Sequence, residues 1–232
     1  MSRRWIGFDL DGTLHDLSVA QVPANDAIFS RIHQSHGLAT ADLDRTYHGA
    51  NADYLSPDAF SSGHDAKHHR TARMQALLEE FGVEDNDLAA ECAEIYGAEI
   101  AASAVVFPDT LPMFERLKAE GFQIAIITER AHDSGLEMLE CLNIDGFIDH
   151  LVTAGGERMT KPDGLIKRAL GRMDCDASQT LYVGDKYDRD VVPAAEAGMV
   201  PVWFAPDVAN APKDPPNLKI IQRLLQVLEL ID

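Results

Sequence analysis

Short apolar runs alternate with amphipathic stretches along most of this chain, and this alternation is the feature that most constrains its fold. Each run ends abruptly in a polar or glycine-containing turn, which is typical of strands buried on both faces. The runs at residues 5–8, 122–127, 147–152, 181–183 and 200–204 are predicted to be strands. Because helical stretches separate them, the spacing predicts βαβ units in an α/β fold, with a Rossmann-like parallel sheet covered on both faces.

The amphipathic stretches between and after these runs predict five helices. They lie at residues 111–119, 134–142, 163–173, 188–197 and 218–230. Asp109 is the expected N-cap of the first helix, and Gly121 follows its end as a typical helix stop.

The segment after the first strand breaks this rhythm. It has no convincing strand run, and its helical stretches lie at residues 25–36, 64–81 and 87–102. An insertion of this length is too long to be a loop. We therefore expect an α/β core domain of residues 1–16 and 105–232, and a smaller, mainly helical domain of residues 17–104.

The chain carries a large excess of acidic side chains. Thirty-eight Asp and Glu against 20 Lys and Arg give a net charge of −18. A field of this sign repels nucleic acid and anionic membranes, so neither is an expected partner, and an anionic substrate needs a locally positive site. Nothing in the pattern specifies an oligomeric state.

Two further counts bear on location. No apolar stretch reaches the roughly 18 residues of a membrane span. Cys92, Cys141 and Cys175 are odd in number and unrelated in spacing, so we expect unpaired thiols in a reducing compartment. We therefore expect a cytoplasmic protein.

Polar side chains follow several predicted strands at their carboxyl ends, which is where open parallel sheets place their sites. Asp9 and Asp11 follow the first strand, Thr128 ends the second, and Asp185 follows a later one. Lys161 stands just before a predicted helix. Clustered carboxylates suit Mg²⁺, whereas a lysine and a hydroxyl suit phosphate oxygens.

Four motifs resemble those of the haloacid dehalogenase superfamily and occur in that family's order. They are residues 8–14 (FDLDGTL), 126–128 (IIT), 161–163 (KPD) and 184–190 (GDKYDRD). The resemblance covers nearly the whole chain. It implies that the inserted helices are a cap of the family's first type, which closes over the site and selects the substrate.

The resemblance also implies an activity, Mg²⁺-dependent hydrolysis of a small phosphate monoester through a phospho-aspartyl intermediate. Asp9 would be the nucleophile, and Asp11 the general acid and base. The Asp9 and Asp185 carboxylates and the Asp11 backbone carbonyl would hold the metal. Thr128 and Lys161 would bind phosphoryl oxygens.

The resemblance also implies a further acid in the fourth motif, which would act on metal-bound waters or on Lys161. Asp190 is our candidate, but Asp188 competes for the role because spacing alone does not exclude it. Glu129 and Arg130 depart from the small or amide residues expected after the second motif. They either shape the substrate pocket or form a surface ion pair, and we favour the ion pair.

Residues 63–73 form the only locally basic stretch of the expected cap. His64 and His68 are four residues apart, as metal ligands on one helix face are. Since no third ligand is evident, we expect a solvated helix face, with a grip on the leaving group or a metal site as alternatives. The roles of His15 and Asp16, just past the first motif, stay open.

Several functions fit these motifs, and a phosphatase acting on a small phosphorylated metabolite fits best. A phosphomutase of the same superfamily is the alternative, and cap contacts would decide between the two. A haloacid dehalogenase needs neither a second aspartate nor a metal, so Asp11 argues against it. A non-catalytic binding module predicts loss of Asp9, Asp11 or Lys161, and all three are present.

Overall fold

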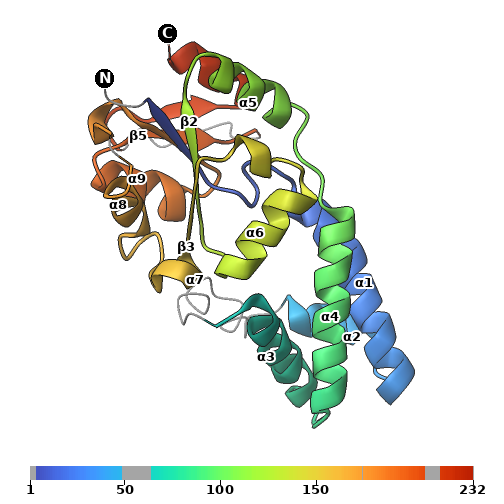
Figure 1. Ribbon diagram of the computed structural model, residues 1–232. Coiled ribbons are helices and arrows are strands. Elements are labelled where there is room, and N and C mark those ends of the chain that lie inside the picture. Colours follow the sequence, from blue (N-terminus) through green and yellow to red (C-terminus); the bar gives the residue numbers. More distant parts are fainter. Residues whose placement is uncertain (1–3, 49–63, 174, 207–214, 232) are drawn as a thin grey trace.

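A parallel sheet of six strands, in the order β3-β2-β1-β4-β5-β6, forms the centre of the computed structural model (Figure 1). The structure describes residues 4–48, 64–173, 175–206 and 215–231. The strands are β1 (Trp5–Phe8), β2 (Gln123–Thr128), β3 (His150–Thr153), β4 (Leu181–Gly184), β5 (Val200–Phe204) and β6 (Lys219–Ile221). The predicted α/β fold with a parallel sheet is confirmed.

Helices cover both faces of this sheet. They are α5 (Thr110–Ala119), α6 (His132–Cys141), α7 (Ala154–Glu157), α8 (Leu165–Leu170) and α9 (Val192–Glu196). Successive residues of β2 point to opposite faces, so Ile124 and Ile126 pack with α5 and α6, whereas Ala125 and Ile127 pack with α8. This alternation explains why the strand is apolar along its whole length.

The prediction of a terminal helix over residues 218–230 is wrong. Residues 219–221 are β6, which pairs only with β5, and a 3₁₀-helix (Leu224–Leu230) follows it. Ile220 is exposed and Ile221 is buried, as in an edge strand with one covered face. A strand of three residues is too short to show an alternation that distinguishes it from the start of a helix.

Two other elements differ from prediction at the residues where they begin. The expected helix over residues 188–197 begins instead as a π-helical turn (Tyr187–Val191), and only then continues as α9. The third strand starts at His150 rather than at residue 147, because a 3₁₀ turn (Asp145–Phe147) precedes it.

Among the described residues between β1 and α5, four α-helices stand apart from the sheet (Figure 1). They are α1 (Leu17–His36), α2 (Thr40–Tyr47), α3 (Ala66–Glu79) and α4 (Asn86–Ser103). Three correspond to predicted helices, whereas α2 was not predicted. The expected cap also contains residues 49–63, which lie outside the described residues. Gly63, the first residue of the basic stretch, is one of them.

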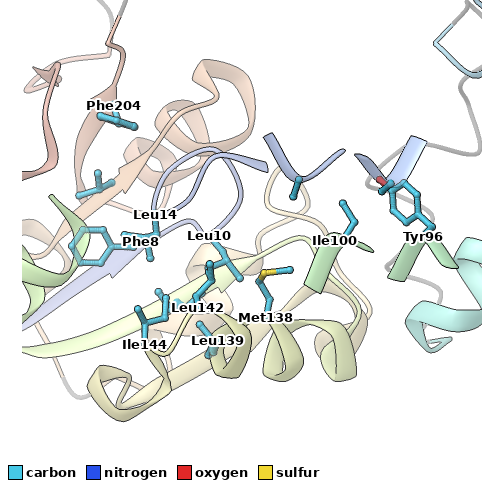
Figure 2. Close-up of a cluster of buried hydrophobic side chains, with 14 of the residues drawn as sticks. Phe8, Leu10, Leu14, Tyr96, Ile100, Met138, Leu139, Leu142, Ile144 and Phe204 are labelled. Atoms are coloured by element: carbon cyan, nitrogen blue, oxygen red, sulfur yellow. The ribbon is translucent and has the colours of Figure 1, made fainter. Parts of the chain in front are cut away.

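The apolar core is continuous from the sheet into these helices. Figure 2 shows Phe8 and Leu10 at the sheet end of the cluster and Tyr96 at its far end. Met138 of α6 and Ile100 of α4 lie between them. Helix α6 therefore joins the two parts of the molecule. No helix among the described residues is long and apolar enough to cross a membrane.

Candidate active site

The carboxyl ends of three neighbouring strands form the candidate site. Asp9 follows β1, Thr128 ends β2 and Asp185 follows β4, and β1 pairs with both of the other two strands. The strand order reverses at β1, since the chain runs outward through β2 and β3 and then returns to β4. Ligands bind at such reversal points in open parallel sheets.

A buried ion-pair triad holds this site together. Lys161 Nζ lies 2.6 Å from Asp9 Oδ1 and 2.5 Å from Asp190 Oδ1. The side chains of Lys161, Asp9 and Asp190 are 3%, 8% and 1% exposed. One cation thus bridges two carboxylates that follow neighbouring strands, β1 and β4, at the same edge of the sheet.

The electrostatics of the triad depend on this bridge. Burial raises the pKa of Asp9 well above its usual value, although Lys161 acts in the opposite direction. Burial alone would lower the pKa of Lys161, but Asp190 and Asp9 raise it well above its usual value. Lys161 therefore stays charged and keeps both carboxylates paired.

Asp190 has its place fixed by the backbone of the π-helical turn. Its Oδ2 accepts a hydrogen bond from the Lys186 backbone N–H at 2.9 Å, and Tyr182 Oη lies 3.2 Å from its Oδ1. A Cβ at Gly184 would lie 2.3 Å from the Asp190 Cγ, so only glycine fits there. Asp188, the competing acid, is exposed and lies outside the triad.

Glu129 orients Lys161 from the end of β2. Its Oε1 accepts a hydrogen bond from the Lys161 backbone N–H at 2.9 Å, and its carboxylate also pairs with Arg189. Glu129 and Arg130 do not form the surface ion pair that we expected. They are consecutive residues beyond a strand end and bind separate partners, Arg130 pairing with Asp11.

Asp11 is held by a guanidinium and an imidazole. Arg130 Nε donates to its Oδ2 at 2.7 Å and Arg130 Nη2 to its Oδ1 at 2.6 Å, while Nη1 reaches Ser134 Oγ at 2.8 Å. His15, fully buried, has its Nε2 2.8 Å from the same Oδ1. Burial alone would raise the pKa of Asp11, but Arg130 and His15 bring it well below its usual value.

Asp185 completes the group of acids at the strand ends. Thr13 Oγ1 donates to its Oδ1 at 3.4 Å, and Lys186 Nζ pairs with its Oδ2 at 3.0 Å. Gly12 lies directly against it with a φ of 80°, and a Cβ there would be 2.6 Å from Asp185 Oδ2. The first motif therefore needs glycine both for its turn and for this close approach. Burial also raises the pKa of Asp185 above its usual value.

The acids at this site fit a hard cation. One carboxylate oxygen from each of Asp9, Asp185 and Asp190 lies within 4.8 Å of the others. Both oxygens of the buried Asp190 accept short hydrogen bonds, from Lys161 and from the Lys186 backbone N–H. Asp185 is more open, and its partners are a long contact with Thr13 and the exposed Lys186 side chain, so Asp9 and Asp185 are the better pair of ligands. A ligand set made only of oxygen atoms suits Mg²⁺.

Thr128 and the two histidines of the basic stretch are the remaining predicted residues. Thr128 is buried beside the end of β1, since the register sets Phe8 opposite Ile126. His64 and His68 stack with ring centroids 4.0 Å apart and are exposed. They are not part of the one metal-suited cluster found among the described residues.

Three polar contacts of the site were not predicted from the sequence. Tyr182 lies in an apolar strand run, yet its Oη reaches Asp190. The sequence specifies no role for His15, which contacts Asp11, and it favours a surface position for Arg130, which also contacts Asp11. The signal available for Arg130 was its departure from the small or amide residues expected at that position.

Removing the bridging cation tests how far the site depends on it. We expect Lys161→Met to lower the free energy of unfolding by about 3–5 kcal/mol, because two buried carboxylates lose their common partner. Lys167→Met, at an exposed position of α8, should change it by about 0.5 kcal/mol or less. Urea unfolding of both variants without added metal measures the difference. Equal stability of the two variants would contradict the assignment.

The sequence matches the family model described as haloacid dehalogenase-like hydrolase over residues 6–204. It is 30% identical over 203 residues to the glyceraldehyde 3-phosphate phosphatase of Pyrococcus abyssi, covering 86% of this chain and 80% of that protein. The corresponding phosphatase of Methanocaldococcus jannaschii is 36% identical over a shorter stretch of 97 residues, 41% of this chain and 42% of that protein. The phosphoglycolate phosphatase of Pasteurella multocida is 27% identical over 83% of this chain and 81% of its own length.

Solved structures show the same fold. The putative HAD-hydrolase YfnB of Bacillus subtilis superposes with a TM-score of 0.77 at 21% identity, covering 100% of this chain and 99% of that chain. A 2-haloacid dehalogenase of Pseudomonas syringae gives a TM-score of 0.76 at 24% identity, covering 99% and 98%. Because the family model matches residues 6–204, which are most of this chain, the chain belongs to the haloacid dehalogenase-like hydrolase family.

Proposed function

We propose that this protein hydrolyses small phosphate monoesters with Mg²⁺, through a phosphoryl group carried on Asp9. The curated relatives are named as phosphatases, which supports the coarser assignment to the phosphoric monoester hydrolases. The observation that carries the finer proposal is the Lys161 bridge, which holds Asp9 beside Asp185 where the strand order reverses.

In the first half-reaction an Asp9 oxygen attacks phosphorus, and the bond from phosphorus to the ester oxygen breaks. The leaving oxygen takes a proton from Asp11. Asp11 can carry that proton only when it is released from Arg130, because contact with the guanidinium favours the ionised carboxylate. Lys161 and Thr128 bind the phosphoryl oxygens and hold the group in line. When bound, Mg²⁺ neutralises phosphoryl charge, and Asp9, Asp185 and the Asp11 carbonyl would hold it.

In the second half-reaction Asp11 accepts a proton from water, which attacks the phosphorus on Asp9 and releases phosphate. Asp190 contacts neither reacting atom in this scheme. It keeps the Lys161 ammonium charged and in place, with the Lys186 backbone N–H fixing its own position. We therefore assign Asp190, rather than Asp188, as the acid of the fourth motif that acts on Lys161.

We also propose the domain division expected from the sequence, with residues 17–104 as a cap. The two connections lie side by side. His15 forms an antiparallel bridge with Val106, and the Phe107 N–H donates to the Leu14 carbonyl at 3.0 Å. A chain that leaves and re-enters the core at one point can move the cap without unfolding the sheet. Asp133 at the start of α6 accepts a hydrogen bond from the Ala66 N–H of the cap.

The assignment of Asp9 is tested by Asp9→Asn. The amide has the same shape but is a far weaker nucleophile, so we expect turnover of a nitrophenyl phosphate to fall at least about 10⁴-fold. The matched control is Asp188→Asn at the neighbouring exposed acid, which should keep most of the activity. Substantial turnover by a clean Asp9→Asn preparation, with circular dichroism confirming its fold, would overturn the assignment.

The metal is tested separately with the unmodified protein. Excess chelator should remove activity and Mg²⁺ should restore it, whereas Ca²⁺ should restore little because it prefers longer bonds and more ligands. Isothermal calorimetry of Mg²⁺ binding gives a second reading, and Asp185→Asn should weaken that binding. Full activity in chelator would rule out the metal-dependent reaction.

A further inference from the structure

Arg130 lies on the leaving-group side of the proposed reaction. Its guanidinium forms a two-pronged contact with Asp11, the residue proposed to protonate the leaving oxygen. A group that contacts Asp11 therefore lies next to whatever the leaving alcohol carries.

The other cations at the strand ends are engaged elsewhere. Lys161 bridges Asp9 and Asp190, Lys186 pairs with Asp185, and Arg189 pairs with Glu129 beside the Lys161 backbone. Arg130, by contrast, contacts no proposed ligand of the phosphoryl group. Within the described site, Arg130 is therefore the guanidinium placed to bind the leaving-group part of the substrate.

The pair is also within reach of a ligand. The Arg130 side chain is 14% exposed and that of Asp11 is 24% exposed, unlike the sealed Lys161 triad. Arg130 lies just before α6, and α6 contacts both α3 and α4 of the proposed cap. The guanidinium is thus located where the core meets the helices above it.

We propose that Arg130 binds a carboxylate on the leaving alcohol, so that the enzyme prefers phosphate esters of short hydroxy acids. This rests on the proposed phosphatase function. The contact with Asp11 shows that the fork formed by Nε and Nη2 of Arg130 can donate to both oxygens of a carboxylate. This is the favoured geometry of an arginine–carboxylate pair.

Exchange of one carboxylate for another makes this binding feasible. The substrate carboxylate replaces Asp11 on the guanidinium, so Arg130 is never left as an unpaired, partly buried charge. Asp11 keeps His15 as a partner and is freed toward the leaving oxygen. Ser134 holds the far nitrogen of the guanidinium and keeps the fork in place during the exchange. A substrate without a carboxylate lacks this exchange.

Two esters that differ only in this group provide the test. Phosphoglycolate carries a carboxylate where ethyl phosphate carries a methyl group, so their ratio of kcat/KM isolates its contribution. The wild-type protein should favour phosphoglycolate. Arg130→Met should reduce that ratio by about 10- to 100-fold, the value of a charge-assisted two-pronged contact, with most of the change in KM. Arg130→Lys, which keeps the charge but not the fork, should lose part of it.

The control variant is Arg116→Met, at an exposed arginine of α5 that pairs with Glu120. It should leave the ratio unchanged. If Arg130→Met slows both esters equally, Arg130 serves only to position Asp11, and the carboxylate proposal is wrong while the phosphatase function stands.

Binding provides a reading that does not need turnover. In calorimetry with Mg²⁺, phosphonoacetate should bind the wild-type protein more tightly than ethylphosphonate, and Arg130→Met and Arg130→Lys should reduce only the phosphonoacetate affinity. If that pattern appears but neither ester is hydrolysed, the phosphatase function fails and the Arg130 site stands. Equal affinities for the two phosphonates in the wild-type protein would overturn the proposal.

Discussion

One buried ammonium group organises this site. Lys161 takes the place of water beside two carboxylates, Asp9 and Asp190. Burying either carboxylate without this ammonium group costs several kcal/mol or forces the acid to take up a proton. The three residues come from the end of β1, the loop before α8 and the turn after β4. Their pairing therefore requires the parallel sheet to be in register, and it fixes the reactive end of the sheet.

A second ion pair extends this order toward the helical part of the molecule. Arg130 ties Asp11, two residues past Asp9, to Ser134 in the first turn of α6. Helix α6 also contacts α3 and α4, and Figure 2 shows Met138 of α6 near Ile100 of α4 in the shared apolar cluster. The site thus has a sealed half around Lys161 and a more open half around Arg130. In the proposed reaction the first would bind the phosphoryl group and the second would face the rest of the substrate.

The sequence predicted the parts of this arrangement that have local signals. Buried strands are short apolar runs, so β1 was recognised with its exact bounds, and Asp9 followed from its position at the end of that strand. Contacts between distant segments had no such signal. The Arg130–Asp11 pair, for example, joins residues 119 positions apart. Family resemblance, rather than spacing, brought Lys161 to Asp9.

Asp190 and Asp188 illustrate the same limit on a smaller scale. Both lie in one short acidic turn, and their separation is compatible with either facing the metal. The π-helical turn buries Asp190 against Gly184 and leaves Asp188 exposed. Helical spacing alone does not encode that wider turn, which arises because Asp190 and Val191 both bond back to the Lys186 carbonyl.

The central claim is that Asp9 carries the phosphoryl group, and chemical trapping tests it most directly. An acyl phosphate is reduced by borohydride to an alcohol, which converts a phosphorylated aspartate into homoserine. We predict that acid quenching during turnover, followed by borohydride and peptide mass spectrometry, reveals homoserine at position 9. An actively hydrolysing sample with homoserine at another aspartate, or with none while acyl phosphate standards are reduced in parallel, would contradict the account.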